Sequence, residues 1–263
     1  MIQNNTIIKR MIDSHPTDRI GFNENIWPYT LKKWVKDEGY PIDEQGNPIS
    51  PIEHFGFDMY EISGWFDVNP LCGHEEIIEE TPEWTIKRNG AGGMLKYWKD
   101  RAGTPEHIGF DMTNREVWEN KYRDHLLTVD CNRFVELMST VADRLRKKSA
   151  DGFWTFYGHM CFWETMRQSL GDMCMYESLL LDPEWIHDYN RVYTDFFKLH
   201  YAKLIEEGGK PDGIWMFEDR GYKNGLVCSP DTLEKLVFPY FQEMVQFFKS
   251  YDLPVFLHSC GGI

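Results

Sequence analysis

The sequence predicts an α/β protein built as a TIM, or (β/α)8, barrel. From Phe153 onward, short apolar runs alternate with amphipathic helical stretches, which indicates parallel strands joined by crossover helices. The length of 263 residues and the 42% of hydrophobic residues allow a large buried core. We therefore expect one barrel domain over residues 1–263, with an open doubly wound sheet of about five strands as the alternative.

The second half of the sequence carries three expected strands and clear helix boundaries. The strands are expected at 153–157, 213–217 and 254–258. Asp182 and Pro183 provide an N-cap and a first-turn proline for a long helix. Ser229 and Pro230 begin a further helix, which is expected to continue to about Tyr251.

The first half of the sequence is less regular. Strands are expected at 20–26 and 57–62, and helices at 28–38, 113–116 and 134–145. Two alternating segments within residues 75–98 flank Asn89 and Gly90, and an Asn-Gly pair is typical of a tight β-hairpin turn. A hairpin insertion is therefore expected at residues 75–98 of the N-terminal half.

The expected strands are fewer than the eight that close a barrel. The count is about five, so the barrel is expected to be incomplete at the C-terminus. Three more strand–helix units, on the order of 80 to 110 residues, would complete it. Without them, strands that should be covered would leave two open sheet edges, which promote aggregation.

Composition and charge exclude several classes of function. A formal charge of −14 disfavours binding to nucleic acids or anionic membranes, because both depend on clustered Lys and Arg. No apolar run reaches the roughly 18 to 20 residues of a membrane span, and the N-terminus lacks the features of a signal peptide. The six cysteines form no CxxC pair, which argues against a disulfide framework or a zinc ribbon. We expect a cytoplasmic protein with a small-molecule ligand and a protein partner.

The sharpest chemical pattern is His258-Ser259-Cys260, at the end of the last expected strand. Alternate residues of a strand face the same side, so His258 and Cys260 can bind one metal ion. An imidazole nitrogen with a thiolate suits zinc, and the two glycines that follow let the backbone turn closely around a site. A catalytic zinc normally has three protein ligands, so a third must come from elsewhere. The alternative is a strand-end histidine and a buried cysteine without metal.

Two acids, Glu218 and Asp219, come directly after the expected strand 213–217. This edge of a barrel is where the loops build the active site. Either acid can complete the metal shell, orient the histidine ligand or transfer a proton. The alternative is that one acid pairs with Arg220 and the other is solvated.

Three further residues are candidates for the same edge of the barrel. His159 and Glu164 follow the expected strand 153–157, although an acid such as Glu164 also suits the first turn of a helix. Asp58 lies beside the expected strand 57–62 and can also face the barrel mouth. The tryptophans are interpreted as core and pocket lining, because no basic groove accompanies them.

Taken together, these residues resemble the uroporphyrinogen-decarboxylase superfamily, and especially its corrinoid-dependent methyltransferase members. The closest similarity covers Phe-Glu-Asp-Arg-Gly-Tyr-Lys-Asn-Gly at 217–225, Ser-Pro at 229–230, Phe-Pro-Tyr at 238–240 and Leu-Pro-Val-Phe-Leu-His-Ser-Cys-Gly at 253–261. Weaker similarity covers Trp-Pro and Thr-Leu at 27–31, Phe-Gly-Phe-Asp at 55–58 and Gly-Thr-Pro-Glu-His at 103–107. The resemblance therefore spans most of the chain.

The resemblance implies a zinc ion bound by His258, Cys260 and a later cysteine, which is expected beyond residue 263. It implies a reaction in which zinc holds a small thiol as a thiolate that attacks a methyl group on a corrinoid partner protein. A folate is the other acceptor that the resemblance allows. The catalytic residues are then expected to be Asp219, Glu218 and His159, and the substrate-binding residues Asp58, Glu164 and Tyr222.

Two other functions remain as alternatives. Uroporphyrinogen decarboxylases need no metal and bind a substrate with many carboxylates through an arginine-rich segment near the first strand. The corresponding residues 21–27 contain no arginine and include Glu24, which makes binding of a polyanion electrostatically unfavourable. The third possibility is a non-catalytic barrel that binds a corrinoid protein.

Overall fold

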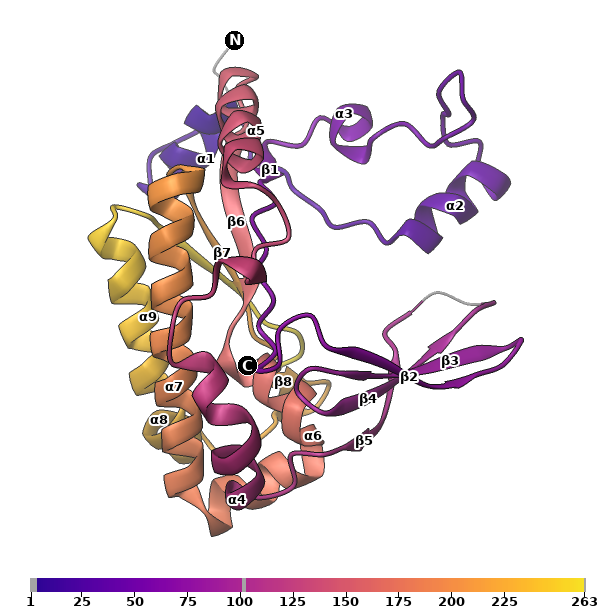
Figure 1. Cartoon of the computed structure of the whole chain (residues 1–263). Coiled ribbons are helices and arrows are strands. Elements are labelled where there is room, and N and C mark those ends of the chain that lie inside the picture. The colour runs from indigo at the N-terminus through magenta and orange to yellow at the C-terminus, as the bar shows by residue number, and fades with distance from the viewer. Residues whose placement is uncertain (1–3, 101–102, 263) are drawn as a thin grey trace.

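A four-stranded parallel sheet lies at the centre of the protein (Figure 1). The computed structural model describes residues 4–100 and 103–262. The strands, in their order across the sheet, are β1 (Met59–Glu61), β6 (Trp154–Met160), β7 (Gly213–Phe217) and β10 (Val255–His258). The predicted α/β fold with parallel strands is therefore confirmed. Within the described ranges β1 and β10 are the outer strands, and no pairing between them closes a barrel.

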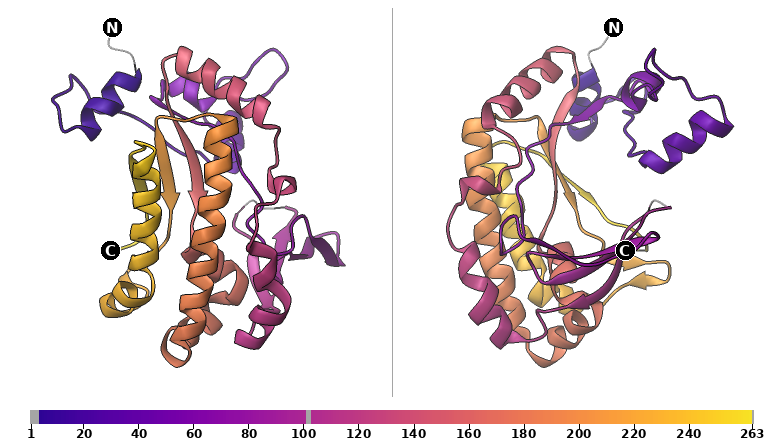
Figure 2. Two further views of the ribbon diagram at one scale, coloured as in Figure 1. Left: turned by 60° about the vertical axis from the view of Figure 1, so that its left-hand side comes forward. Right: turned by 45° about the vertical axis from the view of Figure 1, so that its right-hand side comes forward.

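Helices α7 and α9 pack along one face of this sheet (Figure 2), whereas Ile8 of α1 packs against the opposite face with Met59, Trp154 and Phe156. The helices are α1 (Asn4–Ile12), α2 (Pro28–Asp37), α3 (Pro51–Phe55), α4 (Arg115–Val117), α5 (Met138–Ala150), α6 (Phe162–Leu181), α7 (Pro183–Lys203), α8 (Pro230–Leu236) and α9 (Phe238–Ser250). Single π or 3-10 turns lie at Trp118–Tyr122, Arg123–Leu126, Cys131–Arg133 and Leu204–Gly208. None of the described helices is long and apolar enough to cross a membrane.

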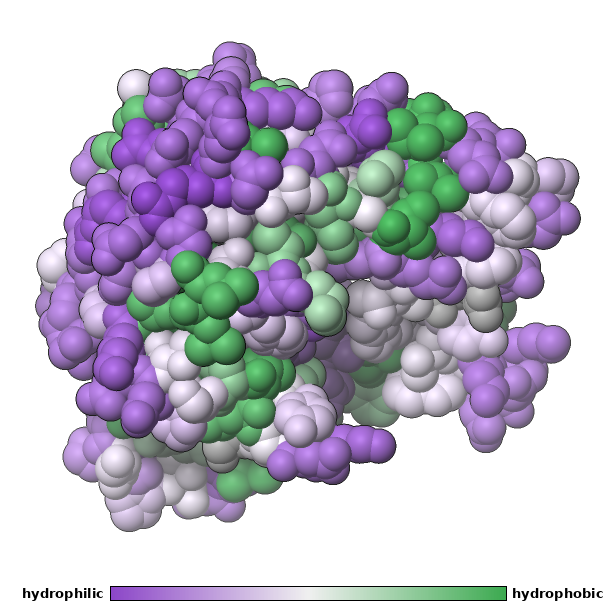
Figure 3. Space-filling model, turned by 90° about the horizontal axis from the view of Figure 1, so that it is seen from below, coloured by the Kyte–Doolittle hydropathy of each residue, from purple (hydrophilic) through white to green (hydrophobic). Residues whose placement is uncertain are grey.

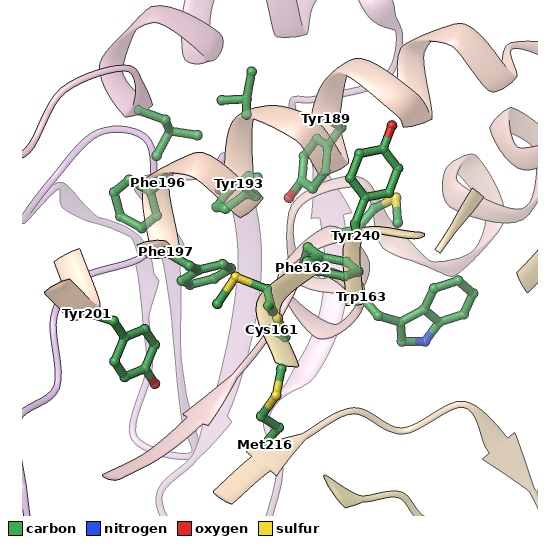
Figure 4. Packing of buried hydrophobic residues seen from close by; sticks show 14 of the residues in the cluster. Cys161, Phe162, Trp163, Tyr189, Tyr193, Phe196, Phe197, Tyr201, Met216 and Tyr240 are labelled. Atoms are coloured by element: carbon green, nitrogen blue, oxygen red, sulfur yellow. The ribbon is translucent and has the colours of Figure 1, made fainter. Parts of the chain in front are cut away.

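The main hydrophobic core lies between these helices and the sheet. Ile214 and Met216 of β7 point into it, and aromatic residues of α7 fill much of it (Figure 4). The predicted N-cap of α7 is confirmed, because the Asp182 side chain accepts a hydrogen bond from the Trp185 N–H. Ser229 caps α8 in the same way, through the Thr232 N–H.

The helix expected from Ser229 to Tyr251 is in fact two helices, α8 and α9. The chain leaves helical geometry at Val237, where φ is −120° and ψ is −52°. Pro239 then lies in the first turn of α9. Proline has no N–H to bond the preceding turn, so it is tolerated at the start of a helix but not in its interior.

The strand expected at residues 20–26 is absent, and this prediction was wrong. Instead, the segment is held by the Asp58 side chain, whose Oδ2 accepts a hydrogen bond from the Phe22 N–H at 2.8 Å. The Arg19 guanidinium donates to both Asp58 carboxylate oxygens at 2.6 Å. These hydrogen bonds to the Asp58 side chain hold the segment in place of backbone pairing with the sheet, so β1 is the first strand of the sheet.

The N-terminal half also forms a separate antiparallel sheet, β2 (Glu75–Glu80), β3 (Trp84–Asn89), β4 (Gly93–Trp98) and β5 (Glu106–Phe110). The turn expected at Asn89 and Gly90 joins β3 to β4, where the Asn89 side chain accepts from the Ala91 and Gly93 N–H groups. The sheet thus has two more strands than the predicted hairpin. A third small sheet pairs β8 (Gly221–Tyr222) with β9 (Gly225–Leu226).

Two predicted helices have boundaries that differ from the expected ones. The helix expected from residue 134 begins as α5 at Met138, because Phe134 instead forms a β-bridge with Phe66. The cap of α4 is Asn114 rather than Thr113, since the Asn114 side chain accepts from the Val117 N–H. Both differences depend on local hydrogen bonds that the hydrophobic pattern does not specify.

Candidate metal centre

Three potential metal ligands, Asp219, His258 and Cys260, converge at the carboxyl edge of the parallel sheet. His258 is in register with Phe217 of the neighbouring strand, so the residues that follow both strands meet at one edge. Cys260 Sγ lies 3.5 Å from His258 Nε2, which lies 3.9 Å from Asp219 Oδ1. All three ligand atoms are within 4.8 Å of one another. Ligands of a tetrahedral zinc ion lie roughly 3.5 Å apart, so this set can close around one ion.

Backbone hydrogen bonds fix the two loops that carry these ligands. The Cys260 N–H donates to Asp219 Oδ1 at 2.8 Å, and the Arg220 N–H donates to Ser259 Oγ at 3.1 Å. The buried Trp163 indole donates to the Asp219 carbonyl oxygen at 3.0 Å. The loop after β7 is therefore tied both to the loop after β10 and to α6.

The His258 imidazole is oriented by aromatic rings of β7. It stacks on Phe217, with ring centroids 5.3 Å apart and an angle of 16° between the planes. It also lies parallel to Trp215, at 6.4 Å and 24°. Stacking restricts the rotation of the imidazole, which favours the orientation in which Nε2 faces Asp219 and Cys260.

Gly261 is a position at which a side chain cannot be accommodated. Its φ is +81°, and a Cβ atom there would lie 2.4 Å from the Tyr222 backbone nitrogen. We expect Gly261→Ala to displace the Cys260 loop and to weaken zinc binding about 10-fold to 100-fold, the range found when support of a ligand is lost. Competition with a chromophoric chelator measures this affinity.

Gly262→Ala is the matched control for that substitution. The nearest atom to a Cβ at residue 262 is 3.6 Å away, which is an ordinary contact. Zinc affinity close to the wild-type value is expected for this variant. Equal affinities in the two variants would contradict the inferred role of Gly261.

The thiol of Cys260 is not activated by the protein alone. Partial burial and the nearby Asp219 carboxylate raise the pKa of the Cys260 thiol. A divalent cation has the opposite effect, since a coordinating thiol loses its proton. A nitrogen, a sulfur and an oxygen donor at one point form a set that fits zinc.

Glu218 faces away from the three ligands, toward the helices. It is fully buried, and its carboxylate lies next to the backbone of Cys161 and Glu164. Arg220 Nη2 lies 3.9 Å from Glu218 Oε2, and its guanidinium packs 4.3 Å from the Phe241 ring centroid. Burial raises the pKa of Glu218 to about 8. A pairing of one of the two acids with Arg220 is the alternative given in the sequence analysis, and Glu218 is the acid that lies near Arg220.

Glu164 contacts the site indirectly. It lies in the first turn of α6, is buried, and its Oε1 accepts a hydrogen bond from the Asp219 N–H at 3.2 Å. The same oxygen accepts from Arg167 at 2.9 Å. Burial raises the pKa of the Glu164 carboxyl despite this partner. Glu164 therefore supports the position of Asp219.

The remaining predicted site residues lie in different parts of the structure. Tyr222 is half exposed on β8, and its carbonyl oxygen accepts from the Gly262 N–H at 3.0 Å, so it borders the ligand loop. Asp58 precedes β1 and lies at the opposite, amino edge of the sheet, bound to Arg19. His159 belongs to β6, and its side chain lies outside the described part of the structure.

Glu61 is a carboxylate that the sequence analysis did not single out. It ends β1 in register with Phe156 of β6, which pairs with Gly213 at the start of β7, so it lies about four residues before the edge that carries the ligand loops. Met59 and Glu61 are alternate residues of the strand expected at 57–62, and this spacing is the pattern that predicts a shared face. Figure 3 shows the molecule from below, on the side where the parallel strands end, and the surface is hollowed near its centre.

Comparison with solved structures finds the same fold in a methyltransferase from Methanosarcina mazei. The TM-score is 0.57 at 12% sequence identity, and the match covers 99% of this chain and 71% of that chain. Comparison with models of known protein families and with curated proteins finds no match. The chain therefore shares its fold with a methyltransferase, in agreement with the resemblance that the sequence motifs indicate.

Proposed function

We propose that this protein is a zinc-dependent methyltransferase that moves a methyl group between a corrinoid protein and a small acceptor, either a thiol or a folate. The observation that carries the proposal is the convergence of an imidazole, a thiol and a carboxylate at the carboxyl edge of a parallel sheet. In (β/α)8 enzymes this edge holds the active site. The fold shared with a methyltransferase supports the same class of reaction.

His258, Cys260 and Asp219 would hold the zinc ion. Zinc, when bound, would keep an acceptor thiol deprotonated near neutral pH. Asp219 is the third ligand in this proposal, and it takes the role for which the sequence resemblance implies a later cysteine. Trp163 and Glu164 keep Asp219 in place through its backbone.

The corrinoid protein is the proposed macromolecular partner, and it would approach the carboxyl edge where the ligands lie. The charge of −14 disfavours nucleic acids and anionic membranes as partners, and we propose a cytoplasmic location. Exposed Tyr222 and the β8–β9 hairpin border this edge and would contact the substrate or the partner.

Methylcobalamin, offered with a panel of small thiols and with tetrahydrofolate, tests this function. We expect the zinc-loaded protein to accelerate the loss of methylcobalamin, chelation to abolish the reaction and added zinc to restore it. Methyl transfer at an undiminished rate after complete removal of metal would contradict the proposal. Metal-free release of carbon dioxide from uroporphyrinogen would favour the decarboxylase instead.

A further inference from the structure

The Glu61 carboxylate lies on the face of the sheet that carries His258. Met59, two residues earlier on β1, packs with Trp154 and Phe156 on this face, so the alternation of a strand places Glu61 there too. A Cβ atom on Gly158 would lie 2.7 Å from Glu61 Oε1. The absence of a side chain at Gly158 therefore leaves room for the carboxylate against β6.

One indole ring connects this carboxylate to the metal ligands. Gly158 is in register with Trp215 of β7, about 4.8 Å away at the usual strand spacing. The Trp215 ring stacks with Phe256 at 5.9 Å and 19°, and with His258 at 6.4 Å and 24°. Glu61 and His258 therefore lie on the same face of the sheet, on either side of the half-buried Trp215 ring.

Glu61 has no positively charged partner within the described chain. In residues 4–100 and 103–262 no ion pair includes Glu61, and its side chain forms a hydrogen bond with the Trp65 side chain. Crowding by the surrounding protein raises the pKa of the Glu61 carboxyl, although the side chain stays accessible from the open side of the sheet. The carboxylate is thus available to a cation that is not part of the protein.

We propose that Glu61 and Trp215 bind an alkylated ammonium group of the small-molecule substrate, on the face of the sheet that also carries His258. Such a group has an apolar surface and a positive charge, which suit the face of an indole and a carboxylate together. The excess of acidic residues in the chain favours a cationic ligand further. The inference deepens the proposed methyl-transfer function and rests on it, because the ligand would be the methyl donor or acceptor.

Calorimetric titration with choline and with 3,3-dimethylbutan-1-ol tests the inference. The alcohol has nearly the same shape but a carbon atom in place of the charged nitrogen. We expect choline to bind at least about tenfold more tightly, a ratio typical of one cation–π and one charge contact. Equal binding of the two compounds would overturn the proposal.

Two variants and one control test whether Glu61 causes the preference for choline over its uncharged analogue. Glu61→Gln keeps the shape of the side chain and is expected to abolish the preference for choline. Gly158→Ala should weaken choline binding as well, because its Cβ occupies the space of the carboxylate. Glu44→Gln, in an exposed loop, should behave as the wild type. An unchanged preference in the Glu61 and Gly158 variants would overturn the proposal.

Titration of both zinc-loaded and chelator-treated protein separates this inference from the proposed function. If the preference for choline is found but no zinc binds, the ammonium site stands and the zinc-dependent function fails. If the wild type binds zinc but binds choline and 3,3-dimethylbutan-1-ol equally, only the proposed ammonium site is contradicted.

Discussion

His258→Ala is expected to remove most of the zinc from the purified protein, whereas the wild type should carry nearly one ion per chain. Structural zinc sites with four protein ligands bind the ion with about 10 to 16 kcal/mol, which corresponds to about 3 kcal/mol for each ligand. Loss of one ligand should therefore weaken binding by roughly 100-fold or more. Elemental analysis after gel filtration measures the content, and Co²⁺ substitution adds a spectroscopic readout of the thiolate ligand.

His74→Ala is the matched control, because His74 is exposed and lies outside the ligand group. This variant should retain zinc as the wild type does. Cys260→Ser and Asp219→Asn should each lose metal if all three side chains are ligands. Retention of a full zinc ion by His258→Ala would contradict the metal centre, and retention by Asp219→Asn alone would remove only Asp219 from it.

The pairing of His258 with Cys260 could be predicted from the sequence because it depends on a local rule, the alternation of side chains in a strand. The sequence did not show which of Glu218 and Asp219 faces the metal ligands and which faces the helices. Every residue of β7 from Ile214 to Phe217 is apolar, so no polar position marked which face pointed to the helices. The structure assigns Glu218 to the helix side, with Met216, and Asp219 to the ligand side.

The failures in the first half of the fold come from contacts between distant residues. Residues 20–26 have apolar side chains at the alternate positions 20, 22 and 26, as a strand can, but the segment is anchored by the Asp58 side chain, 36 residues after Phe22. Glu61 was missed because its surroundings come from Gly158 and Trp215, which lie on strands far along the sequence. Capping residues and proline positions in the second half act within one helical turn, so that half was predicted more closely.

Phe196→Ala is expected to cost about 3 to 5 kcal/mol of unfolding free energy, the usual range for removing a buried aromatic ring. Phe196 has no exposed surface and lies on α7 beside Tyr193 and Phe197 (Figure 4). Its ring centroid is 4.2 Å from that of His200 and 5.0 Å from the Arg133 guanidinium carbon. The truncation would thus leave a cavity and also remove the aromatic face on which a buried cation rests.

Urea denaturation of Phe196→Ala and Leu199→Ala separates this core effect from a general effect on the helix. Leu199 lies on the same helix but is 43% exposed, so its truncation should change the unfolding free energy much less. Similar losses in both variants would indicate that the helix face of Leu199 is also covered, and would contradict the packing described for α7. A loss in Phe196→Ala alone would show that the aromatic face of α7 is the face buried in the core, as its contacts with Tyr193, Phe197 and His200 indicate.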